Sequence, residues 1–295
     1  MKILLLGANG QVGTELQRTL LVLGELKLCT RAQANLEDLK GLRSLIQDYQ
    51  PNVIVNAAAY TAVDRAESDK NQAELINSTA VGVMAQEAKN LDAWLVHYST
   101  DYVFDGEKLE AYIESDTTNP VNVYGGTKCK GEELITSSGC KHLIFRTSWV
   151  YGFHGNNFAG NMIRLFQEKD ELSVVSDQIG VPTSAELIAD ITSTCLIQAL
   201  RKNTDLSGIY HLAPSGNTSW YGFAQYLLEK GQSIVDGLSS HSVNLNPIPT
   251  SQYPTPAKRP KNSLLNTNKI SQEFGIFMPM WQTHVDRFLN QNYGH

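Results

Sequence analysis

The alternation of short apolar runs with helical segments is the feature that most constrains the fold of this chain. Such alternation is typical of βαβ units, which build a parallel sheet. The runs at 3–6 and 53–55 are almost continuously apolar, which indicates strands covered by helices on both faces. We therefore predict a doubly wound parallel sheet in the first half of the chain, with strands at Ile3–Leu6, Lys27–Cys29, Val53–Val55, Trp94–Tyr98, Leu143–Phe145 and, beyond it, Leu172–Val175.

The 295 residues exceed one average domain and allow a second, smaller unit. Beyond residue 150 the pattern is less regular, and five prolines between Pro247 and Pro260 predict an ordered loop there. We expect an α/β fold with a Rossmann-type NAD(P)-binding domain at 1–150, to which later segments return. Residues 151–295 are expected to form an interleaved C-terminal α/β substrate lobe.

Composition excludes several classes of protein. A formal charge of −6 without runs of Lys or Arg argues against a nucleic-acid partner. No stretch approaches the roughly 18 apolar residues of a membrane span, and the start does not match a signal peptide, so we expect no membrane partner and a cytoplasmic location. The sparse cysteines suit a reducing compartment and match no metal motif; they are Cys29, Cys129, Cys140 and Cys195.

A glycine-rich turn, Gly7-Ala-Asn-Gly10-Gln-Val-Gly13, follows the first predicted strand and precedes a predicted helix at Thr14–Leu23. Glycines allow the backbone to approach a pyrophosphate, and the start of a helix stabilises its charge. The spacing differs from G-x-G-x-x-G, so a purely structural turn stays an alternative. The candidate cofactor contacts in this turn are Gly7, Gly10, Gln11, Val12 and Gly13.

Further candidate cofactor contacts follow the second and third strands. An NAD site usually presents a carboxylate after the second strand, whereas this chain has Arg31, which can pair with a 2′-phosphate. This favours NADPH as the cofactor, with NADH as the alternative. Arg31 could equally be a solvated loop charge with no role in binding. The alanines at 57–59, after the strand that ends near Val55, are small enough to leave room for a cofactor. The alternative is that they only pack under a helix. The candidates here are Arg31, Asn35, Leu36, Ala59, Tyr60 and Thr61.

The strongest group for chemistry lies between residues 98 and 128. Tyr124 and Lys128 are four residues apart on a predicted helix and therefore share one face. A nearby ammonium favours the phenolate of a tyrosine, and a hydroxyl from Thr100, at the end of a predicted strand, can join them. Although a Tyr-x-x-x-Lys pair alone is often a surface contact, its combination with the glycine turn predicts proton transfer to a carbonyl.

Through the glycine turn, Asn77, Thr100, Tyr124 and Lys128, the sequence resembles the extended short-chain dehydrogenase/reductase superfamily. More narrowly, it resembles the dTDP-4-dehydrorhamnose reductase family over nearly the whole chain. The strings that carry this likeness are VNAAAYTAVDRAES (55–68), HYSTDYVFDG (97–106), NVYGGTK (122–128), HLIFRTSWVYG (142–152), NNFAGNMIRL (156–165) and YPTPAKRPKNSLLN (253–266).

The resemblance implies reduction of the C4 ketone of dTDP-4-dehydro-L-rhamnose by NAD(P)H, with a nucleotide sugar as the substrate. It implies that Tyr124 donates the proton, that Tyr124 and Lys128 also contact the cofactor, and that Lys128 holds the nicotinamide ribose. It also implies that Thr100 and Asp101 meet the sugar and that Trp149 borders it, although Trp149 could instead belong to the core. Arg259, on a proline-rich loop, could pair with the nucleotide diphosphate or be a surface charge.

The same resemblance implies acidic residues that can hold Mg²⁺ between the subunits of a homodimer. Glu15 and Glu186 match two of these positions, whereas Gln291 replaces the third carboxylate. Hard divalent cations prefer charged oxygen ligands, so we expect metal to be dispensable.

Two other functions stay open. Sugar-nucleotide dehydratases and epimerases keep the same Tyr and Lys, but dehydratases typically place an Asp-Glu pair after the Thr, where this chain has Asp101-Tyr102. The non-catalytic regulatory subunit of methionine adenosyltransferase is also similar to this reductase family. The joint presence of Thr100, Tyr124 and Lys128 favours an enzyme.

Overall fold

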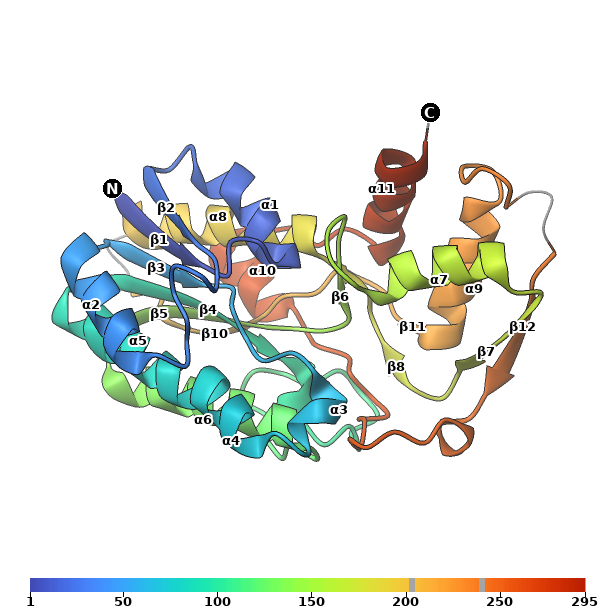
Figure 1. Cartoon of the computed structure of the whole chain (residues 1–295), viewed down its shortest axis with the longest axis horizontal. Coiled ribbons are helices and arrows are strands. Elements are labelled where there is room, and N and C mark those ends of the chain that lie inside the picture. The colour runs from blue at the N-terminus through green and yellow to red at the C-terminus, as the bar shows by residue number, and fades with distance from the viewer. Residues whose placement is uncertain (202–204, 239–241, 295) are drawn as a thin grey trace.

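The computed structural model describes residues 1–201, 205–238 and 242–294. Its centre is a six-stranded sheet in the order β10-β5-β4-β3-β1-β2, in which all neighbouring strands are parallel (Figure 1). The chain leaves β1 toward β2 on one side and returns to β3 on the other, which confirms the doubly wound sheet. The strands are β1 (Lys2–Leu6), β2 (Glu25–Cys29), β3 (Val53–Asn56), β4 (Trp94–Thr100), β5 (Lys141–Thr147) and β10 (Gly208–His211).

Helices cover both faces of this sheet (Figure 1). Successive residues of a strand point to opposite faces, so Ile3 and Leu5 pack with Leu16 of one helical layer, while Leu4 packs with Ile46 of the other. This is why the strands are apolar throughout. The first layer contains α1 (Gln11–Leu20), α8 (Ala185–Arg201) and α10 (Asn268–Phe274), and the second contains α2 (Leu39–Tyr49), α5 (Ala80–Asn90) and α6 (Val123–Ser138).

Short helical elements lie in the connections between the longer ones. Between β3 and α5 lie α3 (Val63–Ala66), α4 (Lys70–Glu74) and the π-helical turn η1 (Leu75–Thr79). The 3-10 turn η2 (Asp101–Val103) lies between β4 and α6, and the 3-10 turn η3 (Thr250–Gln252) lies before α10.

A second group of elements lies beside the sheet and has its own apolar core, in which Phe166, Phe223 and Phe288 are buried (Figure 1). Three two-stranded pairs, β6 with β9, β8 with β11 and β7 with β12, accompany its helices. The elements are β6 (Val150–Tyr151), α7 (Phe158–Glu168), β7 (Glu171–Val175), β8 (Ile179–Gly180), β9 (Thr183–Ser184), β11 (Thr218–Ser219), α9 (Trp220–Gly231), β12 (Asn244–Ile248) and α11 (Trp281–Tyr293).

Three details differ from the sequence predictions. Helix α1 begins at Gln11, three residues earlier than predicted, because the last glycine of the turn is already helical. It ends at Leu20, three residues before the predicted end. The strand expected at 172–175 pairs with β12 and lies outside the main sheet. Pro247, expected in a loop, is part of β12, where a two-stranded pair leaves an edge that tolerates proline.

The division into domains at residue 150 stays a prediction. The structure shows that β10 and α8, which come later in the chain, complete the main sheet and one of its layers.

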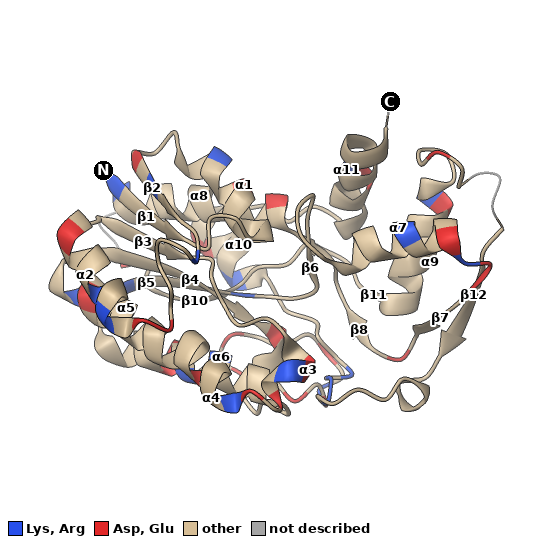
Figure 2. Cartoon of the chain, in the orientation of Figure 1, with Lys and Arg blue, Asp and Glu red and all other residues tan. Residues whose placement is uncertain are grey.

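Basic and acidic residues are interspersed along the helices, strands and loops (Figure 2). None of the helices in the described ranges has the length and apolar character needed to cross a membrane. All four cysteines are buried and free of disulfides.

Candidate active site

A cleft of about 750 Å³ opens at the carboxyl ends of the main strands. Residues that directly follow β1 and β3, together with the last residues of β4 and β5, line it, as expected for a doubly wound sheet. Its lining brings together most of the predicted residues: Gly7, Gly10, Gln11, Val12, Arg31, Asn35, Leu36, Ala59, Thr61, Thr100, Asp101, Tyr124, Lys128 and Trp149.

The glycine turn brings the backbone close to this cleft. Gly7 has φ +76°, and a Cβ on it would lie 2.7 Å from the backbone N of Ala58. A Cβ on Gly13 would lie 2.0 Å from the carbonyl oxygen of Gly7, so Gly13 permits close packing beneath the turn and lies outside the lining. Helix α1 starts after Gly10 without a side-chain cap, which leaves its first N–H groups for an anion.

Arg31 lines the cleft with a side chain that is 73% exposed, and its Nη2 lies 2.5 Å from Oε1 of Glu37. The same oxygen accepts a hydrogen bond from Gln72 Nε2 at 2.8 Å. Glu37 was not among the predicted residues, because it lies six residues after Arg31 and outside the strand end. The cofactor preference stays a prediction.

Tyr60 does not line the cleft, although its neighbours Ala59 and Thr61 do. Its backbone is fixed by Asn77, whose Oδ1 accepts from Tyr60 N at 2.8 Å and whose Nδ2 donates to Tyr60 O at 3.1 Å. Asn77 Nδ2 also donates to Thr127 Oγ1 at 3.1 Å. Asn77 therefore connects the loop after β3 to helix α6.

Tyr124, Lys128 and Thr100 all line the cleft. Helix α6 begins just before Tyr124 because the Asn122 side chain accepts a hydrogen bond from Gly125 N at 2.8 Å. Burial, and then the charge of Asp101, raises the pKa of Tyr124 to about 12, while a hydrogen bond with Thr100 opposes the rise. The phenol therefore holds its proton at neutral pH.

Lys128 is 2% exposed, and burial lowers its pKa to about 8, against the opposing charge of Glu132. Its Nζ donates to the carbonyl oxygen of Tyr98 at 2.5 Å and lies 3.1 Å from Nε2 of His97. His97 was not among the predicted residues, because the strand pattern gives no sign of which face it occupies.

The substrate side of the cleft contains Asp101 and Trp149. Burial raises the pKa of Asp101 to about 7, and hydrogen bonds with Ser263 and Thr100 oppose the rise. Trp149 has φ +47°, a rare conformation for a bulky residue, and stacks on Trp220 with ring centroids 3.7 Å apart. Trp220 also lines the cleft, and no sequence signal marks it.

Arg259 lies outside this lining. Its guanidinium donates to both carboxylate oxygens of Asp64, at 3.1 and 2.8 Å, and it borders a separate cavity of about 580 Å³.

Several buried polar atoms of the cleft have no hydrogen-bond partner within the described structure. Buried polar groups are normally paired, so such a cluster indicates a place for a polar ligand. The atoms are Gln11 Oε1, Ser99 Oγ, Asp101 Oδ2 and Thr147 Oγ1.

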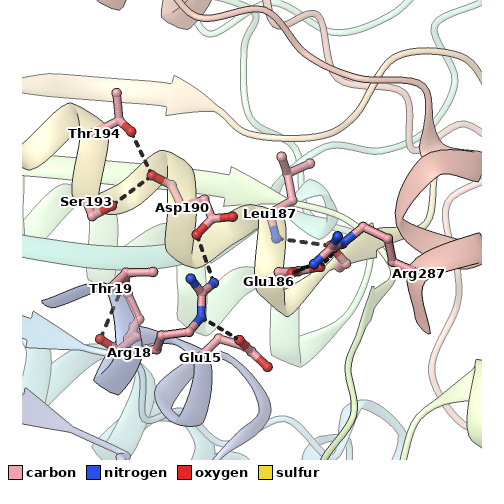
Figure 3. A network of polar contacts seen from close by, with 11 residues as sticks. Glu15, Arg18, Thr19, Glu186, Leu187, Asp190, Ser193, Thr194 and Arg287 are labelled. Atoms are coloured by element: carbon pink, nitrogen blue, oxygen red, sulfur yellow. Dashed lines mark hydrogen bonds and ion pairs between the residues drawn. The ribbon is translucent and has the colours of Figure 1, made fainter. Parts of the chain in front are cut away.

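Glu15 of α1 and Glu186 of α8, both implied for a metal, are outside the lining of this cleft (Figure 3). The Glu186 carboxylate accepts from Arg287 at 3.0 and 2.6 Å, which holds its pKa below the usual value. Arg18 lies 3.8 Å from Glu15 and 2.9 Å from Asp190.

Burial raises the pKa of Glu15, and Gln291 is exposed. Residues 1–201, 205–238 and 242–294 contain no group of three side chains suited to a metal. Arg287 holds Glu186, and Arg18 lies near Glu15, within the same chain. The expectation that metal is dispensable stays a prediction.

Comparisons with known proteins agree with this geometry. The family described as RmlD substrate binding domain matches residues 1–293. The dTDP-4-dehydrorhamnose reductase of Escherichia coli strain K12 is 48% identical over 295 residues, covering 99% of this chain and 98% of its own. That of Burkholderia thailandensis is 46% identical and covers 97% of each chain.

Solved structures of dTDP-4-dehydrorhamnose reductases are also similar to this chain. The dTDP-4-dehydrorhamnose reductase of Bacillus anthracis, in complex with NADP, superposes with a TM-score of 0.88 at 34% identity and covers 98% of this chain and 99% of its own. A UDP-glucose 4-epimerase of Thermus thermophilus in complex with NAD has a TM-score of 0.75 at 18% identity, covering 98% and 99% of the two chains, and shows the fold alone.

Proposed function

The chain belongs to the dTDP-4-dehydrorhamnose reductase family, and from this premise we propose that it reduces the C4 ketone of dTDP-4-dehydro-L-rhamnose to dTDP-L-rhamnose with NADPH. The observation that carries this proposal is the full-length match to these reductases in a chain whose Tyr124, Lys128 and Thr100 meet in one cleft.

The cleft fits a dinucleotide. The glycine turn and the uncapped start of α1 suit a pyrophosphate, and Gln11 has an unpartnered side-chain oxygen beside them. Arg31 would hold a 2′-phosphate, and Ala59 and Thr61 would border the cofactor. When bound, NADPH supplies the hydride for the ketone carbon.

Tyr124 is the proton donor in this proposal. Its phenol keeps its proton at neutral pH, and Thr100 hydrogen-bonds to it and orients it. As negative charge develops on the ketone oxygen, the Tyr124 proton moves to that oxygen. In this proposal the Lys128 ammonium, which lines the same cleft, stabilises the phenolate left behind. With a pKa of about 8, it is acidic enough to return a proton to that phenolate.

Asp101, Trp149 and Trp220 would hold the sugar. Asp101 Oδ2 lies buried without a partner and can bond a sugar hydroxyl. The stacked indoles form a flat apolar wall beside it. We also propose that the sheet unit, 1–150 with its returning segments, binds the cofactor, while the lobe of 151–295 supplies this wall. The cytoplasmic location and the homodimer stay predictions.

Two alternatives are less well supported. A dehydratase needs its own acid and base for elimination, and Tyr102 stands where the second carboxylate would be. A non-catalytic binding protein would not require proton-transfer residues in its cleft, whereas this cleft is lined by Tyr124, Lys128 and Thr100.

The test is NADPH oxidation, followed by absorbance, after addition of purified dTDP-4-dehydro-L-rhamnose, with NMR of the product. We expect turnover to dTDP-L-rhamnose. Binding of NADPH and sugar without oxidation would overturn the proposal, and a C4 epimer as the product would correct its stereochemistry.

A further inference from the structure

Behind the cleft, Lys128 is connected to a buried pair of polar side chains on neighbouring strands. Asn56 at the end of β3 lies directly opposite His97 of β4 in the parallel register, and each is 1% exposed. Asn56 Nδ2 lies 3.1 Å from His97 Nδ1, and His97 Nε2 lies 3.1 Å from Lys128 Nζ. The three side chains therefore form a buried line from the sheet to the active-site helix.

The orientation of the Asn56 amide fixes which nitrogen of His97 carries a proton. Asn56 Oδ1 accepts a hydrogen bond from Ala58 N at 3.2 Å, so the NH₂ end of the amide faces the imidazole. An NH₂ group can only donate, and Nδ1 must therefore offer a lone pair. Burial, and then the charge of Lys128, holds the pKa of His97 well below its usual value, so the ring is neutral and its proton is on Nε2.

This tautomer presents an N–H to Lys128. A neutral amine can accept that hydrogen bond while donating one to the carbonyl oxygen of Tyr98, whereas an ammonium has no lone pair with which to accept. The arrangement therefore favours loss of a proton from Nζ. We propose that Asn56 and His97 are positioning residues: by presenting Nε2–H to Lys128 they favour its neutral amine and make its ammonium a readier proton donor.

Among the polar groups packed around Lys128, His97 is the one that favours loss of a proton from Nζ. On α6, the charge of Glu132 acts in the opposite direction and favours the ammonium. That carboxylate is already bound by Arg146 of β5, at 3.0, 3.2 and 2.7 Å. On the other side of His97 in the sheet lies the apolar Ile144.

The inference rests on the proposed function. The ketone carbon receives the hydride, and Tyr124 gives its proton to the ketone oxygen. One proton then leaves Lys128 and restores the Tyr124 phenol. The resulting amine accepts the hydrogen bond from His97 Nε2 until it takes a proton from solvent. His97 stays neutral throughout and exchanges no proton.

The direct test is ¹⁵N NMR of histidine-labelled wild-type protein, with the His97 signals assigned by their loss in His97→Phe. We expect a protonated Nε2 and an unprotonated Nδ1 at pH 7. A protonated Nδ1 would overturn the proposal. This measurement needs no turnover, so its result is independent of whether the protein reduces the proposed sugar.

The second test is the pH profile of kcat. In Asn56→Asp, a carboxylate accepts from Nδ1–H, so Nε2 turns its lone pair to Lys128 and stabilises the ammonium. In His97→Phe the opposing N–H is lost. We expect the alkaline limb of both profiles to move to higher pH, by about one unit for a tenfold change in proton affinity. An alkaline limb that is unchanged, or moves to lower pH, in folded variants would contradict the proposal.

His142→Phe is the matched control for the second test. His142 is also buried, near the start of β5, but its Nδ1 contacts the carbonyl oxygen of Cys140, and it does not line the cleft. Its pH profile should match that of the wild type.

Discussion

Tyr124 keeps its proton at neutral pH because burial and Asp101 raise its pKa to about 12. We expect Tyr124→Phe to lower kcat by about 10²–10⁴-fold, the usual size of general acid catalysis, with little change in the KM for NADPH. Steady-state kinetics measure both. Tyr226→Phe, which removes a hydroxyl bonded to Asp286 in the second lobe, is the control. Wild-type kcat in Tyr124→Phe would assign the proton to another group.

Arg31 is a more exposed residue with a competing partner, Glu37. Because its guanidinium would pair with a 2′-phosphate, Arg31→Ala should lower the ratio of kcat/KM for NADPH over NADH, by about tenfold at most for so exposed a contact. Arg164→Ala, which removes an exposed pair with Glu168, should leave the ratio unchanged. An unchanged ratio in Arg31→Ala would show that 2′-phosphate selectivity lies elsewhere.

Asp101 connects the site to stability. Its folded pKa of about 7 lies above the ordinary value of 3.8. Between these values the unfolded chain ionises while the folded carboxyl stays protonated, so the free energy of unfolding falls as pH rises from about 4 to 7 and is then level.

The variant Asp101→Asn has no carboxyl at this position, so its free energy of unfolding lacks this fall with pH. Its Tm, relative to the wild type, should therefore increase from pH 4 to pH 7.5, although substrate binding should weaken. Scanning fluorimetry over this range, on the wild type and the variant side by side, tests it. A flat difference for Asp101→Asn would mean that its carboxyl ionises normally in the folded protein.

At the scale of elements, the glycine turn and helix α6 offer a matched pair of substitutions. A Cβ on Gly13 would meet the Gly7 carbonyl, so Gly13→Ala should cost about 1–3 kcal/mol of stability and weaken NADPH binding. A Cβ on Gly126 in α6 would point into open space, with no described atom within 4 Å, so Gly126→Ala should gain about 0.5–1 kcal/mol. Urea unfolding and NADPH fluorescence titration measure these effects. Equal stabilities would show that the turn relaxes freely.

Elements that have a local signal were predictable from the sequence. The apolar strands that lead into the cleft were predicted, as was the Tyr124–Lys128 face of α6, because strand and helix periods are visible in one segment. The partners that complete the site come from distant segments. Trp220 reaches Trp149 from α9, and His97 reaches Lys128 across two elements, and no spacing within one segment encodes such contacts.

At the scale of the whole molecule, the carboxylates between α1, α8 and α11 are held by arginines of the same chain. We therefore expect EDTA to leave both the rate of NADPH oxidation and the sedimentation coefficient unchanged. Untreated protein and EDTA-treated protein supplied with Mg²⁺ are the controls. A loss that Mg²⁺ restores would establish a structural or catalytic cation.

The position of β10 in the sheet has a consequence for biosynthesis. The strand that covers the edge of β5 is separated from it in the chain by residues 148–207. At roughly 5–20 residues per second, a ribosome takes several seconds to make that stretch. During this time β5, with Leu143, Ile144 and Phe145, presents an unpaired edge that can pair with another nascent chain. Chaperones that shield such edges would therefore matter more for the yield of this protein than for its final stability.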